Sequence, residues 1–111
     1  MYHLNSMNAR DETSILSRRL ALIGVPSSAG ARRTGQEGAP AALRAAGLVE
    51  QLQAKGLALI DLGDQPSAVF RPDPGHPRQQ NLDLVADVAR RVADRVDRAL
   101  ADSTLPVVLG G

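Results

Sequence analysis

The sequence has 111 residues, of which 43% are hydrophobic and 23% charged, so its composition fits one ordinary globular domain. A formal net charge of +1 and an aromatic content of 2% exclude the basic, aromatic-interleaved surface that is typical of nucleic-acid binding. The chain has no cysteine for disulfides and no run of about twenty apolar residues. We therefore expect a cytoplasmic protein that binds neither nucleic acid nor a membrane.

The first seventeen residues are polar and lack hydrophobic periodicity, so we predict a mobile tail over 1–17 and a folded region over 18–111. The folded region should begin with a strand over 19–25, a continuous apolar run that Gly24 and Pro26 bring to an end. A strand without polar alternation is typical of a parallel sheet that is covered on both faces.

A long turn and a helical pattern follow this strand. We predict a helix over 39–55, which Gly47 either kinks or divides in two. Glu37 precedes the helix start, where a negative charge is favourable for the helix dipole. Within the turn, Ser27 and Ser28 are expected to bond to their own backbone.

A second strand is predicted over 57–63, with Asp61 as an unusual residue inside it. Because an unpaired buried carboxylate is costly, Asp61 should lie near the strand end or accept hydrogen bonds. The next stretch, 64–80, holds four prolines and is predicted to be a loop. His76 lies in this loop, and we expect it to be exposed rather than to bind a metal.

The strongest helical pattern covers 81–101, and either Asn81 or Pro77 could begin the helix. The residues predicted for its apolar face are Val85, Val88, Ala89, Val92, Val96 and Leu100. The ion pairs predicted for its solvated face are Asp87–Arg91, Arg90–Asp94 and Asp94–Arg98. A third strand is predicted over 105–109.

The element order is therefore β-α-β-α-β, which predicts an α/β fold with a parallel sheet. The most economical strand order is 2-1-3, with the first strand in the centre. The turns after the first and third strands then meet at one end of the sheet, where open α/β sheets bind their ligands.

Most motifs that carry chemistry are missing. No dinucleotide fingerprint GxGxxG occurs, and Gln36 and Glu37 stand where a phosphate loop requires Lys and Ser or Thr. There is no nucleophile elbow, and His3 and His76 each stand alone rather than in a metal-ligand pattern. Two classes remain open on the residues alone: a small module that binds an anion or nucleotide at the glycine-rich loop 30–38 and the helix start, and a noncatalytic scaffold.

The stretch 24–48 is similar to the amino-terminal signature of the arginase family, the ureohydrolases. The matching residues are Gly24, Pro26, Gly30, Arg33, Gly35, Pro40, Leu43, Arg44, Gly47 and Leu48. Further on, IDLGD at 60–64 resembles the second strand of that family, and PVVLGG at 106–111 resembles its third strand. Ala39 departs from the pattern, because the family usually has Gly before the proline.

This resemblance implies the three-layer α/β/α fold of the arginases and the activity of a dimanganese hydrolase. Such an enzyme cleaves a C–N bond in a guanidinium or amidine substrate, arginine or a related compound, and releases urea or an analogue. It also implies assembly into homotrimers or hexamers.

In the family, the Gly-Gly after the third strand is followed by Asp-His, whose His is the first manganese ligand. The resemblance therefore implies that these residues are the amino-terminal part of such an enzyme, with no catalytic or metal-ligating residue and no activity alone. Arg33 matches a position near the mouth of the family's active site, which makes it a candidate for the substrate lip. Gly110 and Gly111 would let the backbone turn at the metal rim.

Overall fold

The computed structural model describes residues 19–110. The tail predicted over 1–17 and the candidate Gly111 lie outside these described residues. The elements in chain order are β1 (Leu20–Val25), η1 (Gln36–Gly38), α2 (Ala39–Ala45), α3 (Leu48–Ala54), β2 (Leu59–Asp64), α4 (Leu82–Ala101) and β3 (Leu105–Gly110).

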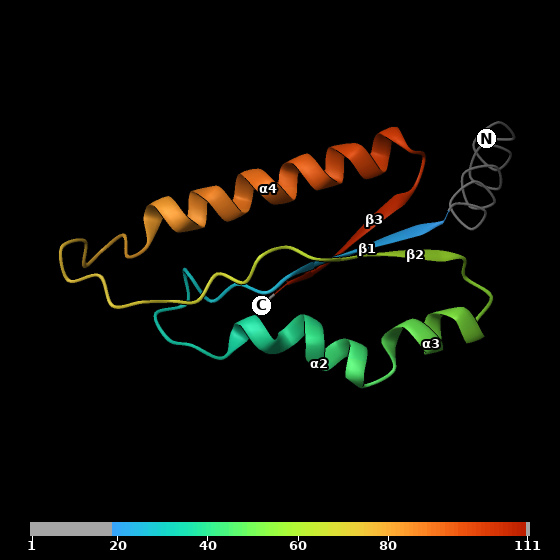
Figure 1. The fold of residues 1–111 in the computed structure, drawn as a ribbon, viewed down its shortest axis with the longest axis horizontal. Helices are drawn as coiled ribbons and strands as arrows, with labels where there is room; N and C mark the ends of the chain where they lie inside the picture. The colour runs from blue at the N-terminus through green and yellow to red at the C-terminus, as the bar shows by residue number, and fades with distance from the viewer. Residues whose placement is uncertain (1–18, 111) are drawn as a thin grey trace, which may run out of the picture.

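The three strands form one parallel sheet in the order β2-β1-β3, which confirms the predicted topology. Helix α4 lies along one face of the sheet, and α2 and α3 lie along the other, so the fold has three α/β/α layers (Figure 1). Strands β1 and β3 run in full register from Leu20 opposite Leu105 to Val25 opposite Gly110. Their carboxyl ends therefore meet at the same edge of the sheet, as predicted.

The core is centred on β1, since this strand has a neighbour on each side and helices over both faces. Five of its six residues are buried, and Leu22 and Ile23 are completely buried. Strand β2 lies at the edge of the sheet and is largely exposed or half-buried, with Ile60 among the exposed apolar side chains. The unbroken apolar run at 19–25 is thus explained by the central position of β1.

The helical stretch after the first strand is divided into α2 and α3 at Gly47. This glycine has a φ of 95°, a left-handed conformation that disfavours any residue with a Cβ. Its amide donates to the carbonyl of Arg44 at 3.0 Å, which closes α2, and its own carbonyl accepts from Gln51 in α3. Of the two outcomes predicted at Gly47, the structure has the two separate helices.

Helix α4 packs its apolar face on the sheet largely as predicted, since Val85, Val88, Val92 and Val96 are half-buried, but the two other predicted residues are exposed. Its buried residue is Ala99, whereas the predicted Leu100 is 53% exposed and Ala89 is also exposed. The reason lies in the last turn, where the amide and hydroxyl of Thr104 both donate to the carbonyl of Ala99, at 3.0 and 2.7 Å. These bonds hold the Ala99 side of the helix end next to β3 and leave Leu100 outside.

Two of the predicted ion pairs on α4 are present, Asp87–Arg91 at 3.1 Å and Asp94–Arg98 at 3.2 Å. The third prediction is wrong, because Arg90 lies 4.0 Å from Asp87, on the preceding turn, and is not paired with Asp94. With these charges along one side, α4 lacks the apolarity of a membrane span, as does every other helix in the part of the chain that the structure describes.

Candidate functional site

The carboxyl edge of the sheet is built from two connections that run side by side. One leaves β1 toward η1, and the other leaves β2 toward α4. Three backbone hydrogen bonds join them: Gln65 to Gly24 at 2.8 Å, Ala68 to Pro26 at 3.0 Å, and Ser28 to Ala68 at 2.8 Å. The parallel pairing of β1 and β2 is thus continued past the sheet, and this edge has a defined backbone rather than two loose loops.

Ser28 lies at the centre of this edge and is only 1% exposed. Its hydroxyl oxygen accepts a hydrogen bond from the amide of Phe70 at 2.9 Å, and the hydroxyl donates to Glu37 at 3.3 Å. The prediction that Ser28 bonds its own backbone is therefore wrong, because a buried hydroxyl here is reached by groups from the neighbouring connection. Ser27 does follow the prediction, since its hydroxyl oxygen accepts from the amide of Ala29 at 3.3 Å.

Glu37 closes the same loop from its other end. Its two carboxylate oxygens accept from the amide of Gly35, at 2.6 and 3.1 Å. Glu37 precedes α2, as predicted, and it lies in the short 3-10 helix η1 with its carboxylate turned back to the loop. Its carboxylate therefore occupies backbone and side-chain donors that an external anion would need.

The candidate Arg33 lies on this loop, between Ser28 and Gly35, and is exposed. Its neighbour Arg32 has a φ of 65°, an uncommon value for a residue with a side chain, so the loop is held in a conformation with a steric cost. The candidate Gly110 is the last residue of β3, opposite Val25, and is also exposed. The structure therefore brings Arg33 and Gly110 to the same edge of the sheet.

The described residues do not form a metal centre. Across residues 19–110, no three His, Cys, Asp or Glu side chains are grouped closely enough to hold an ion. The imidazole of His76 is 71% exposed and bonds to Asp73, with its Nδ1 at 3.0 and 3.2 Å from the two carboxylate oxygens. His76 is thus exposed, as predicted from the sequence.

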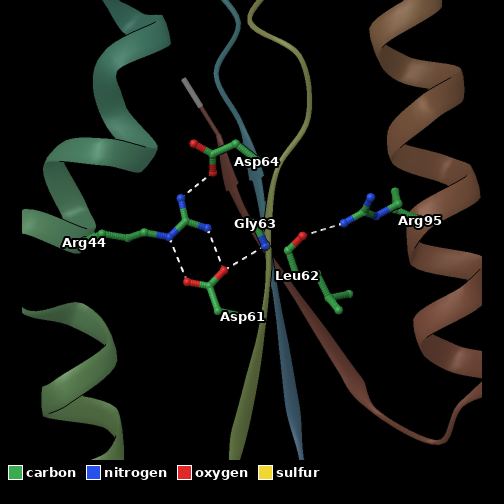
Figure 2. A network of polar contacts seen from close by, with 6 residues as sticks. All are labelled: Arg44, Asp61, Leu62, Gly63, Asp64 and Arg95. Carbon is green, nitrogen blue, oxygen red and sulfur yellow. Dashed lines mark hydrogen bonds and ion pairs between the residues drawn. The ribbon is translucent and has the colours of Figure 1, made fainter.

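A polar clamp joins the end of α2 to the end of β2, and Figure 2 shows it. Arg44 binds Asp61 with two parallel hydrogen bonds, from Nε to Oδ2 at 3.0 Å and from Nη2 to Oδ1 at 2.9 Å. Its third nitrogen, Nη1, bonds to Asp64. The planar guanidinium fits this arrangement because its donors are fixed in a fork. Asp61 therefore accepts hydrogen bonds, which is one of the two alternatives predicted for this residue from the sequence.

The clamp lowers the pKa of one of its carboxyl groups, that of Asp61. The hydrogen bonds from Arg44 lower the pKa of Asp61 below its ordinary value of 3.8, and the amide of Gly63 lowers it further. In the same way, the two carboxylates raise the pKa of Arg44. Arg44 and Asp61 therefore stay ionised at neutral pH, and the clamp holds α2 on the sheet.

A bulge in β2 makes room for the clamp. Leu22 pairs with Asp61 and Gly24 pairs with Asp64, so β2 contains one residue more than β1 over this interval. Gly63 absorbs the bend with a φ of 78° and donates its amide to Asp61 at 2.9 Å. On the opposite face, the carbonyl of Leu62 accepts from Arg95 of α4 at 2.7 Å (Figure 2).

The second connection is held by Asn81, which lies at the N-cap position of α4, one of the two predicted starts of this helix. Asn81 precedes α4 with a φ of 58°, and its side chain makes no capping bond to the helix. It bonds to the backbone of Arg71 instead: its Oδ1 accepts from the Arg71 amide at 3.0 Å, and its Nδ2 donates to the carbonyl at 2.8 Å. Asp73 accepts the amide of Asn81 at 3.1 Å. The chain is thus pinned before it enters α4.

The geometry explains what this edge can do. Ser28, Glu37, Arg44 and Asp61 bond to one another or to the backbone, and no ligand set is formed among residues 19–110. The arrangement is that of a rigid support, in which Arg33 is exposed and Gly110 marks the sheet edge. The fold and the site together define the class: a parallel α/β domain whose loops line the carboxyl edge of the sheet.

The comparison with known proteins gives the family. Residues 18–111 match the model of the Arginase family, so the chain belongs to the arginase family. It is 36% identical to the arginase of Bacillus caldovelox over 94 residues, which are 83% of this chain and 31% of that protein. It is 38% identical to the human protein named Arginase-2, mitochondrial, over 96 residues, which are 83% of this chain and 26% of that protein.

Solved structures give the same result for the fold. The native structure of the arginase from Bacillus caldovelox superimposes with a TM-score of 0.75 at 35% identity, over 85% of this chain and 32% of that one. An arginase structure from Bacillus subtilis, at 1.7 Å resolution, gives a TM-score of 0.72 at 33% identity, over 85% and 31%. The chain spans about a third of the length of these relatives.

Proposed function

We propose that the chain forms the amino-terminal part of an arginase-like hydrolase that cleaves a C–N bond of a guanidinium or amidine substrate. Arginine or a related compound is the substrate, and urea or an analogue is the product. The observation that carries this proposal is the match of residues 18–111 to the arginase family, with similarity to arginases over 83% of the chain.

In this proposal, residues 19–110 are scaffold. Two manganese ions belong to the proposed enzyme by its family, but the described residues offer no ligand set for them. We therefore assign no metal ligand and no chemical step to these residues. Their part is to hold the carboxyl edge, where the ends of β1 and β3 meet, in a fixed shape.

We assign Arg33 to the lip of the substrate site. Its support is its match to a family position at the active-site mouth and its exposed place on the loop at the carboxyl edge. Gly110, at the end of β3, and Gly111 are assigned to the backbone of the metal rim. A small guanidino or amidino compound is the expected partner of this edge.

The alternative of an anion- or nucleotide-binding module is less favourable. In the loop 30–38, the carboxylate of Glu37 already accepts hydrogen bonds from the amide of Gly35 and the hydroxyl of Ser28. A phosphate in the same place would displace Glu37 and meet its negative charge. No observation on this edge favours a nucleotide over the arginase-like role.

A chimera tests the proposal. Residues 18–111 replace the aligned segment of the Bacillus caldovelox arginase, and release of urea from arginine and agmatine is measured with manganese present. We expect a folded, active chimera, because the scaffold superimposes on that enzyme with a TM-score of 0.75. A chimera that folds and assembles like the parent but releases no urea would contradict the proposal.

The 111-residue chain alone provides the second test. We expect no urea release, and no calorimetric signal for manganese binding at micromolar concentration. Micromolar binding would show that the chain holds a metal site of its own. We also propose a cytoplasmic location and a homotrimer or homohexamer for the whole enzyme, which cell fractionation and light scattering of the chimera would test.

A further inference from the structure

A groove lies between α4 and the edge strand β2. It consists of two adjoining cavities, of about 530 and 260 Å³, which share Arg95 and Arg98 in their walls. The larger cavity has an apolar floor, to which β2 contributes Ile60 and Leu62, and Ile60 is 37% exposed. A cavity of this volume with apolar lining and a few polar groups is typical of a site for a small molecule.

Arg95 stands where the two cavities meet, and its positive charge has no carboxylate partner among residues 19–110. The side chain is half-buried, and its Nη2 donates to the carbonyl of Leu62 at 2.7 Å (Figure 2). The neighbouring Arg98 differs, because it pairs with Asp94 at 3.2 Å. A guanidinium carries several N–H donors, and the carbonyl of Leu62 does not neutralise its charge. Arg95 is therefore the group in this groove that an anion would bind.

A second donor in the smaller cavity also lacks a partner. Gln65 lines this cavity beside Arg91 and Arg95, and it is only 7% exposed. Its side-chain Nε2 is buried and bonds to no other atom of the described residues. A buried N–H donor without an acceptor destabilises the fold, so such a group needs an explanation. An acceptor bound in the groove next to Arg95 would supply one.

The charges in the walls limit the kind of anion. The larger cavity has three arginines and one carboxylate, that of Asp102, which lies about 10 Å beyond Arg95 along the helix axis. Asp94 adds a further negative charge to the wall of the smaller cavity. A doubly charged anion such as phosphate would be repelled by both carboxylates and would gain nothing from the apolar floor. A single carboxylate with an apolar body fits both features.

We propose that the groove binds a small aliphatic monocarboxylate. Its carboxylate accepts hydrogen bonds from Arg95, with the side-chain amide of Gln65 as a further donor, and its aliphatic chain lies over Ile60 and Leu62. The pair with Arg95 is charge-assisted, and the apolar floor adds the burial of CH₂ groups. This inference does not rest on the proposed function, because it uses only the groove between α4 and β2.

The test is an NMR titration of the 111-residue chain with acetate, butanoate, hexanoate and octanoate. Shifts are expected for the Leu62 amide and for Nε of Arg95. The affinity should rise about twofold to fourfold for each CH₂ group, as for partly to fully buried CH₂. Octylamine, which has the same chain with a positive charge, should not bind. Three results would overturn the inference: no shifts with octanoate, an affinity independent of chain length, or equally tight binding of inorganic phosphate.

Variants on the two sides of the groove test its parts. Arg95→Gln should weaken octanoate binding about tenfold, the loss of one charge-assisted contact, and Arg95→Lys should keep part of the affinity. Ile60→Ser should weaken the binding of octanoate but not that of acetate. Arg90→Gln is the matched control, since Arg90 is 73% exposed on α4 and does not line the groove. The same octanoate affinity in Arg95→Gln as in Arg90→Gln would contradict the site.

Gln65→Leu separates a role in binding from a structural role. Leucine has no unpaired donor, so the unliganded fold should unfold at a higher urea concentration. The affinity for octanoate should nevertheless fall about threefold, because the ligand loses one hydrogen bond. A purely structural residue would change the urea midpoint alone. An unchanged affinity in Gln65→Leu would therefore refute the assignment of this amide to the ligand.

Discussion

Gly24 lies so close to Asp64 that there is no room between them for a side-chain carbon. A Cβ built on Gly24 would overlap the Oδ1 atom of Asp64 and would lie 2.7 Å from its Cγ. It would also lie 3.2 Å from Nη1 of Arg44. The absence of a side chain at Gly24 therefore allows the carboxylate of Asp64 to reach Arg44 across the end of β1.

The first prediction concerns this contact. Gly24→Ala should force Asp64 away from Arg44 and lower the free energy of unfolding by about 1–3 kcal/mol, as overpacking of a tight site does. Gly38→Ala is the matched control, because a Cβ there meets nothing within 4 Å and the φ is −79°. Urea denaturation of both variants measures the difference. Equal stabilities of the two variants would contradict the steric role of Gly24.

The second prediction concerns the fork of Arg44. Arg44→Lys keeps the charge but removes the parallel bonds to Asp61, so it should destabilise the fold about as much as Asp61→Asn. The side chains of Arg44 and Asp61 are 22% and 33% exposed, so solvent screens the pair. A double-mutant cycle between Arg44→Lys and Asp61→Asn should give a coupling of about 1 kcal/mol. A coupling near zero would show that the clamp is a surface contact without consequence.

The third prediction concerns the fall in the free energy of unfolding at acid pH. The folded-state pKa of Asp61 is lowered, so its contribution is fully present above its ordinary value of 3.8 and is lost as the pH falls through the lowered value. Asp61→Asn should therefore flatten the fall in unfolding free energy below about pH 4. Denaturation curves from pH 2 to 6 provide the measurement.

The layout of the sheet could be predicted from the sequence because it depends on patterns that are local. An apolar run of strand length at 19–25 required a central position, and the order of strands and helices then required a parallel sheet. The break at Gly47 is local too, since a glycine inside a helical pattern weakens the helix at its own position. The burial of Ala99 in place of Leu100 was not predictable in this way, because Ala99 is directed to the sheet by bonds from Thr104, beyond the helix end.

The clamp and the bonds of Ser28 depend on pairings that local patterns do not contain. Asp61 is conspicuous as a carboxylate inside a strand, but its partner Arg44 is 17 positions earlier and in another layer of the fold. Ser28 bonds to Phe70, which is 42 positions away. Turn rules assign Ser28 to its own turn because they count only nearby backbone groups. Pairings of this kind follow from the packing of two connections side by side, which no spacing within either one reveals.

The fourth prediction concerns Asn81. Asn81→Ala should destabilise the fold by about 1–2 kcal/mol, because it loses both bonds to Arg71 and leaves a Cβ residue at a φ of 58°. Asn81→Gly loses the same bonds but accepts that φ, so it should recover part of the loss. Hydrogen exchange of the Arg71 amide, which donates to Asn81, should be faster in both variants. An Arg71 amide that exchanges at the same rate in all three proteins would contradict the assignment of Asn81 as the residue that pins this connection.

The last prediction concerns the pH dependence of the pair His76–Asp73. Asp73 raises the pKa of His76 above 6.5, and His76 in turn lowers the pKa of Asp73 below 3.8. The imidazolium of His76 contributes to the stability of the fold below its ordinary pKa, and this contribution is lost as the pH rises through the raised value. That of the carboxylate is lost as the pH falls through the lowered value. NMR titration of the His76 ring should show its pKa return toward 6.5 in Asp73→Asn. Asp83→Asn, which removes a smaller contribution to the raised pKa of His76, should shift that pKa less. The same pKa in Asp73→Asn as in the unaltered chain would mean that the pair does not form in solution.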